Sequence, residues 1–282
     1  MTNVKFSEAG KPIIIGVVKE PTADDASRAI AASEAMGANA FDLHVSLLEG
    51  DERKPENIAK IALRANSPIL AVHYNNAPGP KGSRYHDTSE QRMEELLRAV
   101  EYGGCAGIDM QAYTFCADSR ATLVGKDVEK YPFIAKNPKE VVLDDAIIEK
   151  QMKMIEKVHS AGGEVLMSCH MGVFLNTEEV VALALEMEKR GPDIIKMVMP
   201  VSSKDDVVNA LNSVLRLNEA VKSAKVHLHC SGKLGRITRY VAPYFGSALV
   251  FATDYYNEKA DREQLLISDF KAFHSQVVFP EA

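Results

Sequence analysis

The sequence lacks several features that would define its class at once. It has no Trp, no apolar run long enough to cross a membrane and no C-x-x-C pair among its four cysteines, Cys105, Cys116, Cys169 and Cys230. Scattered cysteines are typical of reduced thiols in a cytosolic protein rather than of a disulfide framework or a structural zinc site. The first apolar run, residues 13–18, is too short for a signal peptide. We therefore expect a soluble, cytoplasmic protein with no membrane partner.

Basic charge is also scarce. The chain has 33 Lys and Arg against 39 Asp and Glu, giving a net charge of −6. Nucleic-acid affinity comes mainly from clustered basic charge, so we expect no nucleic-acid partner. No G-x-G-x-x-G follows the first apolar run, which argues against a dinucleotide-binding sheet.

The sequence does contain a regular alternation of apolar runs and helical patterns. The runs are typical of parallel strands covered on both faces, because they are apolar throughout rather than at alternate positions. Eight such units in 282 residues predict one α/β domain, residues 1–282, folded as a single (β/α)8 TIM barrel, with a doubly wound sheet as the alternative. The predicted strands are residues 12–20, 40–48, 68–75, 107–114, 164–171, 194–200, 225–232 and 248–255.

Helix signals between these runs support the alternation. A helical pattern over residues 24–36 ends at Gly37, another begins at Thr177, and others cover residues 144–161 and 203–221. One connection is much longer than the rest: residues 114–143, after the fourth strand. Long loops are usually functional. We expect this one to be either a lid over the catalytic face or an oligomer contact.

Barrel enzymes build their sites at the carboxyl ends of the strands, so polar residues late in each run are the candidates. Polar groups there often only bind loops. The candidates are Lys19, Glu20, Asp42, His44, His73, Tyr74, Asp109, Gln111, His170, Lys196, His229 and Asp254.

Lys196 is the most informative candidate, because large apolar residues flank it in the run I-I-K-M-V-M-P. Lysine is rarely buried without a partner, and burial favours its neutral, nucleophilic form. We interpret it as an imine-forming lysine, the alternative being a side chain that reaches the barrel rim. His170 ends the preceding strand, where an imidazole could act as the general base.

The loop after the seventh strand, residues 231–239, contains two glycines and the basic residues Lys233, Arg236 and Arg239. Backbone N–H groups and an arginine fork suit a carboxylate or a phosphate.

These motifs resemble type I 3-dehydroquinate dehydratase, a Schiff-base family of class I aldolase-like barrels. The matching pieces are G-A-N-A-F-D-L-H-V-S-L-L-E (37–49), M-S-C-H (167–170), D-I-I-K-M-V-M-P (193–200), G-R-I-T-R (235–239) and F-G-S-A-L (245–249). The resemblance implies that Lys196 forms the imine, His170 moves the proton, Arg239 anchors the substrate carboxylate and Gln264 binds substrate. It also implies a lyase that eliminates water from a cyclic oxo acid, without a metal or an organic cofactor. We expect a homodimer.

The first half departs from the family pattern. Asp42-Leu43-His44 stands where the family has Glu-x-Arg, Tyr74 follows His73 where an arginine is expected, Gln111 replaces a glutamate, and Ala260 replaces a serine. We therefore predict retained chemistry with altered recognition, so that 3-dehydroquinate is a poor substrate or a related, less hydroxylated oxo acid is the real one. We expect His44, His73 and Tyr74 to face that substrate, and Asp42 and Gln111 to bind it as well. In the opposing hypothesis, Arg84, Arg120 or Lys126 restores the missing charge.

Two alternatives come from other classes. Asp42, His44, His73, Asp109, His170 and His229 could hold a divalent metal in a barrel hydrolase or isomerase. A non-catalytic sugar-acid binding protein would keep Arg239 but would have no need of a buried lysine.

Overall fold

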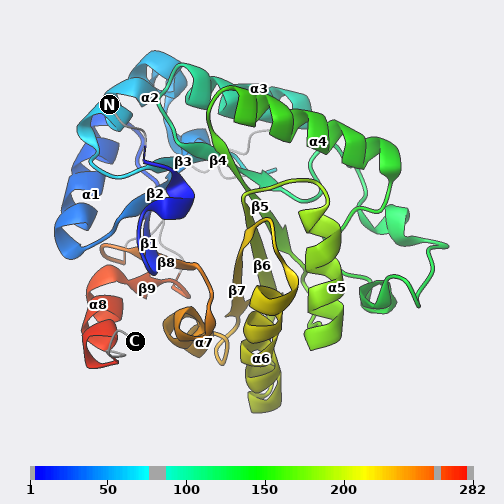
Figure 1. Ribbon diagram of the computed structural model, residues 1–282. Helices are drawn as coiled ribbons and strands as arrows, with labels where there is room; N and C mark the ends of the chain where they lie inside the picture. Colours follow the sequence, from blue (N-terminus) through cyan, green and yellow to red (C-terminus); the bar gives the residue numbers. More distant parts are fainter. Residues whose placement is uncertain (1–3, 76–86, 257–261, 278–282) are drawn as a thin grey trace.

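The computed structural model describes residues 4–75, 87–256 and 262–277. Its centre is a curled parallel sheet with helices around the outside (Figure 1). The strands are β1 Ile13–Val18, β2 Ala40–His44, β3 Ile69–Val72, β4 Gly107–Gln111, β5 Glu164–His170, β6 Ile194–Pro200, β7 Lys225–Ser231, β8 Leu249–Thr253 and β9 Leu265–Leu266. Each of the eight predicted strands lies where the apolar runs placed it.

Strands that are consecutive in the sequence pair with each other from β1 to β7, and β8 pairs with β1. Strands β7 and β8 do not form a ladder, and we call the boundary between them the seam. The order is β7-β6-β5-β4-β3-β2-β1-β8-β9, with every pair parallel. At the seam, Ala248 N donates to Val226 O (2.9 Å), and Leu228 N donates to the side-chain oxygen of Ser247 (3.4 Å) rather than to a backbone carbonyl. The predicted barrel fold is confirmed, but no strand ladder closes it here, because a serine side chain takes the place of a ladder partner.

The helices begin where side chains can cap them. Asn176 and Ser203 accept hydrogen bonds from the backbone N–H three residues on, and Gly37 ends α1 in the left-handed region at φ 105°. The helices are α1 Ala23–Met36, α2 Pro55–Arg64, α3 Ser89–Glu101, α4 Asp145–Ser160, α5 Thr177–Glu188, α6 Lys204–Ala220, α7 Arg236–Val241 and α8 Ile267–Gln276. Short 3₁₀ helices are η1 Phe6–Glu8, η2 Val45–Leu47, η3 Gly50–Arg53, η5 Arg120–Leu123, η6 Pro132–Lys136 and η7 Ala242–Phe245.

The barrel interior is apolar at one end and polar at the other. Inward side chains near the amino ends of the strands form a separate core of Phe6, Ile13, Ile15, Ala40, Leu70, Leu166, Ile194, Leu249 and Phe251. Phe6 of η1 is fully buried there, and Ser7 is held by two hydrogen bonds to Glu164. Side chains alternate along a strand, so the next inward positions on β5 and β6, Ser168 and Lys196, lie one layer higher. This packing makes the upper half of the barrel the place for a site.

The long connection after β4 lies beside α5, with η6 packed against that helix (Figure 1). Its return to the barrel is fixed by the buried Arg190, which donates to the carbonyls of Ala112 and Val142 and to the side chain of Gln151. Burial lowers the pKa of Arg190 to about 10. The segment therefore has a defined path, which brings Glu140 to the end of β5.

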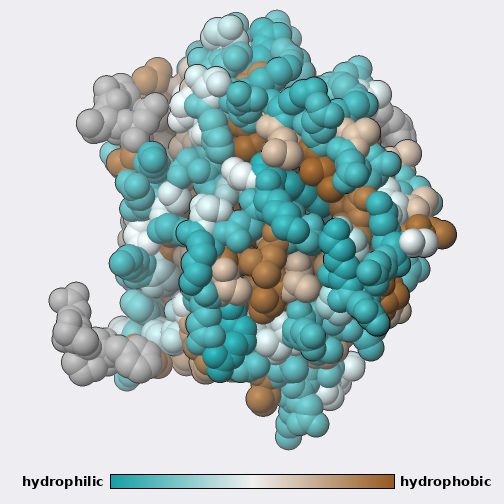
Figure 2. Space-filling view, turned by 45° about the vertical axis from the view of Figure 1, so that its right-hand side comes forward, coloured by the Kyte–Doolittle hydropathy of each residue, from teal (hydrophilic) through white to brown (hydrophobic). Residues whose placement is uncertain are grey.

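The molecular surface is mainly polar. Figure 2 shows a face that is hydrophilic over most of its area, with apolar residues near its middle. Within the described ranges, no helix is both long and apolar enough to cross a bilayer. All four cysteines are free and buried, as expected, and burial raises the pKa of Cys105 to about 12.

Candidate active site

The buried Lys196 is the centre of the polar layer. It is 5% exposed, and its Nζ lies 2.8 Å from the hydroxyl of Tyr74, 3.2 Å from Oδ2 of Asp109 and 4.5 Å from the ring centre of Phe251. Asp109 also accepts hydrogen bonds from Tyr74 (2.6 Å) and Ser168 (2.5 Å). The prediction that Lys196 is buried is confirmed. Its charged partner is the carboxylate of Asp109 on β4.

Tyr74 connects this lysine to the barrel rim. Its ring makes edge contacts with His170 and His44, at centroid distances of 5.7 and 6.0 Å. Burial, and then the negative charge of Asp109, raise the pKa of Tyr74 well above 10. The phenol therefore stays protonated, so it can donate to Asp109 while its oxygen accepts from Lys196.

His170 is held by a residue of the long connection. Oε2 of Glu140 accepts from the backbone N–H of His170 (2.7 Å) and lies 3.0 Å from Nδ1 of its ring. This contact leaves Nε2 as the ring nitrogen available for proton transfer. Glu140 has φ 59°, in the left-handed region that a non-glycine residue rarely adopts. Backbone strain at such a position is common near functional sites.

Three more predicted residues lie on the same inner side. Asp42 is buried on β2, its Oδ2 is 3.6 Å from Nε2 of His44, and its Oδ1 has no hydrogen-bond partner in the described part of the chain. Gln111 ends β4 and accepts from the backbone N–H of Asn75 (2.7 Å). A buried carboxylate oxygen without a donor is costly unless a ligand supplies one.

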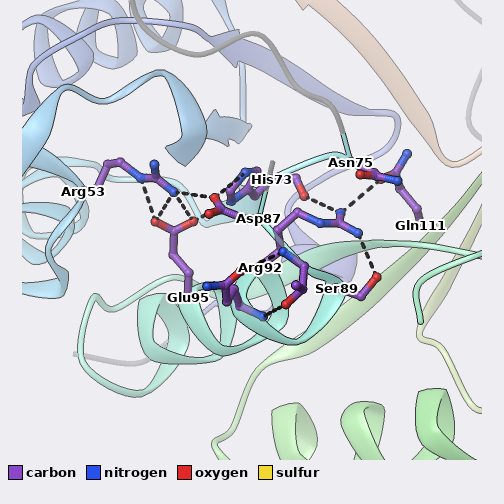
Figure 3. A network of polar contacts seen from close by, with 10 residues as sticks. Arg53, His73, Asn75, Asp87, Ser89, Arg92, Glu95 and Gln111 are labelled. Carbon is purple, nitrogen blue, oxygen red and sulfur yellow. Dashed lines mark hydrogen bonds and ion pairs between the residues drawn. The ribbon is translucent and has the colours of Figure 1, made fainter. Parts of the chain in front are cut away.

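His73 lies outside this group. Its Nδ1 is 2.6 Å from Glu95 of α3, which is also bound by Arg53, while Arg92 joins Gln111 to Ser89 (Figure 3). Both residues follow the end of β3 at Val72, and their contacts differ: His73 contacts Glu95 of α3, whereas Tyr74 contacts Lys196. The structure does not bring His73 to the substrate side of the barrel.

The predicted anion-binding residues lie at the ends of β7 and β8. Arg239 of α7 is buried, and its Nη2 is 3.6 Å from Glu263, which also accepts from Gly232 N (2.8 Å). Gln264 follows Glu263 and precedes β9, and its carbonyl accepts from Tyr256. The carboxylate of Glu263 thus accepts from Gly232 N, one of the loop N–H groups that we expected to bind substrate.

Sequence reasoning missed Glu140, because it lies in a connection with no strand or helix pattern. The signal that could have found it is an acidic residue just before the apolar V-V-L that leads into α4. Arg84 and Ala260 lie outside the described residues, and Arg120 and Lys126 are exposed in the long connection.

The metal-site alternative required six side chains to converge. His73 faces α3 instead, and no group of three or more His, Cys, Asp and Glu in the described ranges could hold a metal ion. The structure therefore gives no support to the predicted ligand set.

The fold and this site define a parallel-barrel protein with a buried lysine beside a carboxylate and with a histidine at the rim. The sequence model of the family described as Type I 3-dehydroquinase matches residues 14–273. The chain therefore belongs to that family and is a lyase, as the resemblance indicated.

Named relatives agree with this assignment. The 3-dehydroquinate dehydratase of Methanosarcina acetivorans is 26% identical over 269 residues, covering 94% of this chain and 95% of that one. Its counterpart from Methanosarcina mazei is 23% identical over 278 residues, covering 96% and 97%.

Solved structures share the fold. The 3-dehydroquinate dehydratase of Geobacillus kaustophilus HTA426 matches with a TM-score of 0.74 at 17% identity, covering 97% of this chain and 95% of that one. The type I enzyme of Clostridium difficile matches with a TM-score of 0.71 at 16% identity, covering 97% of each.

Proposed function

We propose that the protein eliminates water from 3-dehydroquinate, or from a closely related cyclic oxo acid, through an imine on Lys196. The observation that carries the proposal is the buried lysine amine, with Asp109 and Tyr74 within 3.2 Å. Asp109 is the nearest carboxylate that could accept the proton that Lys196 must lose before it attacks a ketone.

The chemical steps use groups already in place. The amine of Lys196 adds to the ketone carbon, and loss of water gives the imine. His170 removes a proton from the carbon next to the imine carbon, which leaves an enamine. The enamine expels the hydroxyl group one carbon further on, the protonated His170 returns its proton to that group, and water leaves. Hydrolysis of the product imine frees Lys196.

Glu140 is proposed as the positioning residue for His170. Its carboxylate fixes the ring by contacting both the backbone N–H and Nδ1 of the histidine. A carboxylate in this place also stabilises the imidazolium formed in the first proton transfer.

Substrate recognition is assigned to the ring of polar groups above Lys196. Arg239 is suited to hold the substrate carboxylate, and Asp42, beside His44 on β2, is proposed to accept from a substrate hydroxyl. His44, Tyr74 and Gln111 are proposed to face the substrate, with Gln264 near the carboxylate end.

The segment 114–143 exposes two valines, Val124 at 81% and Val128 at 52%. These exposed side chains favour an oligomer contact over a lid, and we propose that the protein is a homodimer. Its free, buried cysteines support a cytoplasmic location.

Imine trapping tests the proposed function. Borohydride reduces a lysine imine to a stable secondary amine, so treatment with 3-dehydroquinate should add mass to the peptide containing Lys196. Lys196→Met should give no adduct and no turnover. Lys225→Met is the matched control, because Lys225 is exposed to solvent as the first residue of the neighbouring strand β7. Turnover retained in Lys196→Met would overturn the proposal.

A further inference from the structure

Three buried polar side chains along the β7–β8 seam have no role in the proposed mechanism. Oγ of Ser247 lies 2.7 Å from Nδ1 of His227, and Nε2 of His227 lies 2.6 Å from Nδ1 of His229. The three residues are 3%, 3% and 5% exposed. They form a continuous chain that ends at Nε2 of His229.

The available donors and acceptors determine which atom donates in each of these hydrogen bonds. Ser247 has one hydroxyl proton, and among the described residues its acceptor is Nδ1 of His227. The serine oxygen itself accepts from Leu228 N. A neutral imidazole that accepts at Nδ1 carries its proton at Nε2, so His227 donates to Nδ1 of His229. His229 consequently carries its own proton at Nε2.

Both histidines are neutral at physiological pH. Burial holds the pKa of each well below 6.5, and the charges of Arg239 and Lys196 lower both further. Their pairing register places them inside the barrel. His227 is opposite Lys196 and His229 is opposite Val198, so both lie on the strand face that Lys196 uses.

The hydrogen-bonded series of side chains ends in a donor, the Nε2–H group of His229. Nε2 of His229 has no acceptor in the part of the chain that the structure describes, yet it is not among the buried polar atoms closed off from solvent. A fixed N–H at the polar end of the barrel, within electrostatic range of Arg239, suits an anionic oxygen.

We propose that His229 is a substrate-binding residue whose Nε2–H donates to the substrate carboxylate beside Arg239, and that Ser247 and His227 set its tautomer as positioning residues. The inference rests on the proposed function for the identity of the ligand. The proposed contact supplies a neutral hydrogen-bond donor from β7. In the same site, His44 and Tyr74 replace the arginines expected on β2 and β3.

Two isosteric variants separate the roles of the two ring nitrogens. His229→Gln keeps a donor near the position of Nε2, whereas His229→Asn keeps a polar group only near Nδ1. The probes are quinate, in which a hydroxyl replaces the ketone so that no imine can form, and its carboxamide. Calorimetry should show quinate binding weakened about ten- to a hundredfold by His229→Asn and largely retained by His229→Gln. Binding of the carboxamide should change little in either variant.

Ser247→Ala tests the positioning role. Without the hydroxyl donor, His229 is no longer held as an Nε2–H tautomer, so quinate affinity should fall while carboxamide affinity does not. For 3-dehydroquinate the same variant should raise KM with little change in kcat.

The outcomes distinguish this inference from the proposed function. Equal quinate affinity in the wild type, His229→Asn and Ser247→Ala would overturn the inference, even if borohydride still traps Lys196. Failure to trap Lys196 in the wild type would overturn the imine instead, and quinate binding would still report on His229. If His229→Asn does not fold, Ser247→Ala decides alone.

Discussion

The hydroxyl oxygen of Tyr74 lies 2.8 Å from Nζ of Lys196 and donates its proton to the carboxylate that pairs with the same lysine. Tyr74 stands where the family resemblance led us to expect an arginine. A neutral phenol therefore contacts the lysine directly, in place of a second cation. This contact connects the proposed imine-forming amine to the part of the site that differs most from the family pattern.

Tyr74→Phe should slow imine formation. The variant removes an acceptor for Lys196 and a donor to Asp109, so both groups lose a buried hydrogen bond worth about 0.5–1.5 kcal/mol. Single-turnover trapping with borohydride should show a rate lower by about threefold to tenfold. Tyr102→Phe is the control, since Tyr102 is an exposed tyrosine at the end of α3. An unchanged trapping rate in Tyr74→Phe would show that the hydroxyl has no part in preparing the lysine.

Glu140→Gln should lower kcat while leaving KM nearly unchanged. The amide can still accept a hydrogen bond from His170, but it carries no charge to stabilise the imidazolium. General acid–base catalysis contributes about 10²–10⁴-fold, and we expect the variant to lose a substantial part of it. Steady-state kinetics measures this effect.

Glu129→Gln controls for a charge change in the same connection, because Glu129 is exposed. A rise in KM with kcat unchanged would assign Glu140 to substrate binding instead.

The chain should turn over 3-dehydroquinate with a kcat/KM below the usual enzyme range of about 10⁴–10⁸ M⁻¹s⁻¹. Two bidentate arginines are absent, and a charged hydrogen bond is worth about 1.5–3 kcal/mol. Kinetics on 3-dehydroquinate and on a panel of less hydroxylated cyclic oxo acids would check this. A value inside the range would refute altered recognition.

Stability should fall between about pH 6.5 and pH 5. His227 and His229 have folded-state pKa values well below 6.5, so the unfolded chain binds protons in this interval and the folded chain does not. The free energy of unfolding then drops by about 1.4 kcal/mol per pH unit for each histidine. Urea unfolding at several pH values measures the slope.

His227→Leu should flatten that slope. Equal slopes in the wild type and in His227→Leu would contradict the assignment of the pH effect to the seam.

Local signals predicted most of the fold. Continuous apolar runs specified the strands, and Asn176, Ser203 and Gly37 marked helix ends because capping depends on a few adjacent residues. Lys196 could be identified for a related reason, since a charged residue inside an apolar run is conspicuous in the sequence.

The rest of the site depends on contacts between distant segments. Glu140 reaches His170 only because Arg190 and α5 fix the path of the long connection. The sequence grouped His73 with Tyr74, although His73 contacts α3 and Tyr74 contacts Lys196. The direction of each side chain follows from register with neighbouring strands, which composition does not reveal.

The open seam between β7 and β8 has a consequence for how the barrel moves. The seam is joined by one backbone hydrogen bond and by two contacts of the Ser247 hydroxyl, with Leu228 N and with Nδ1 of His227, so it has fewer backbone hydrogen bonds to break than the ladders elsewhere in the sheet. Amide hydrogen exchange should therefore be faster at Ala248 and Leu228 than at Met167 or Met197 in the middle of the sheet. Ser247 and His227 belong to both the seam and the donor chain, so each local opening would also interrupt the donor chain to His229. In this barrel, the rate of local opening and the affinity for a carboxylate are linked through the same two side chains.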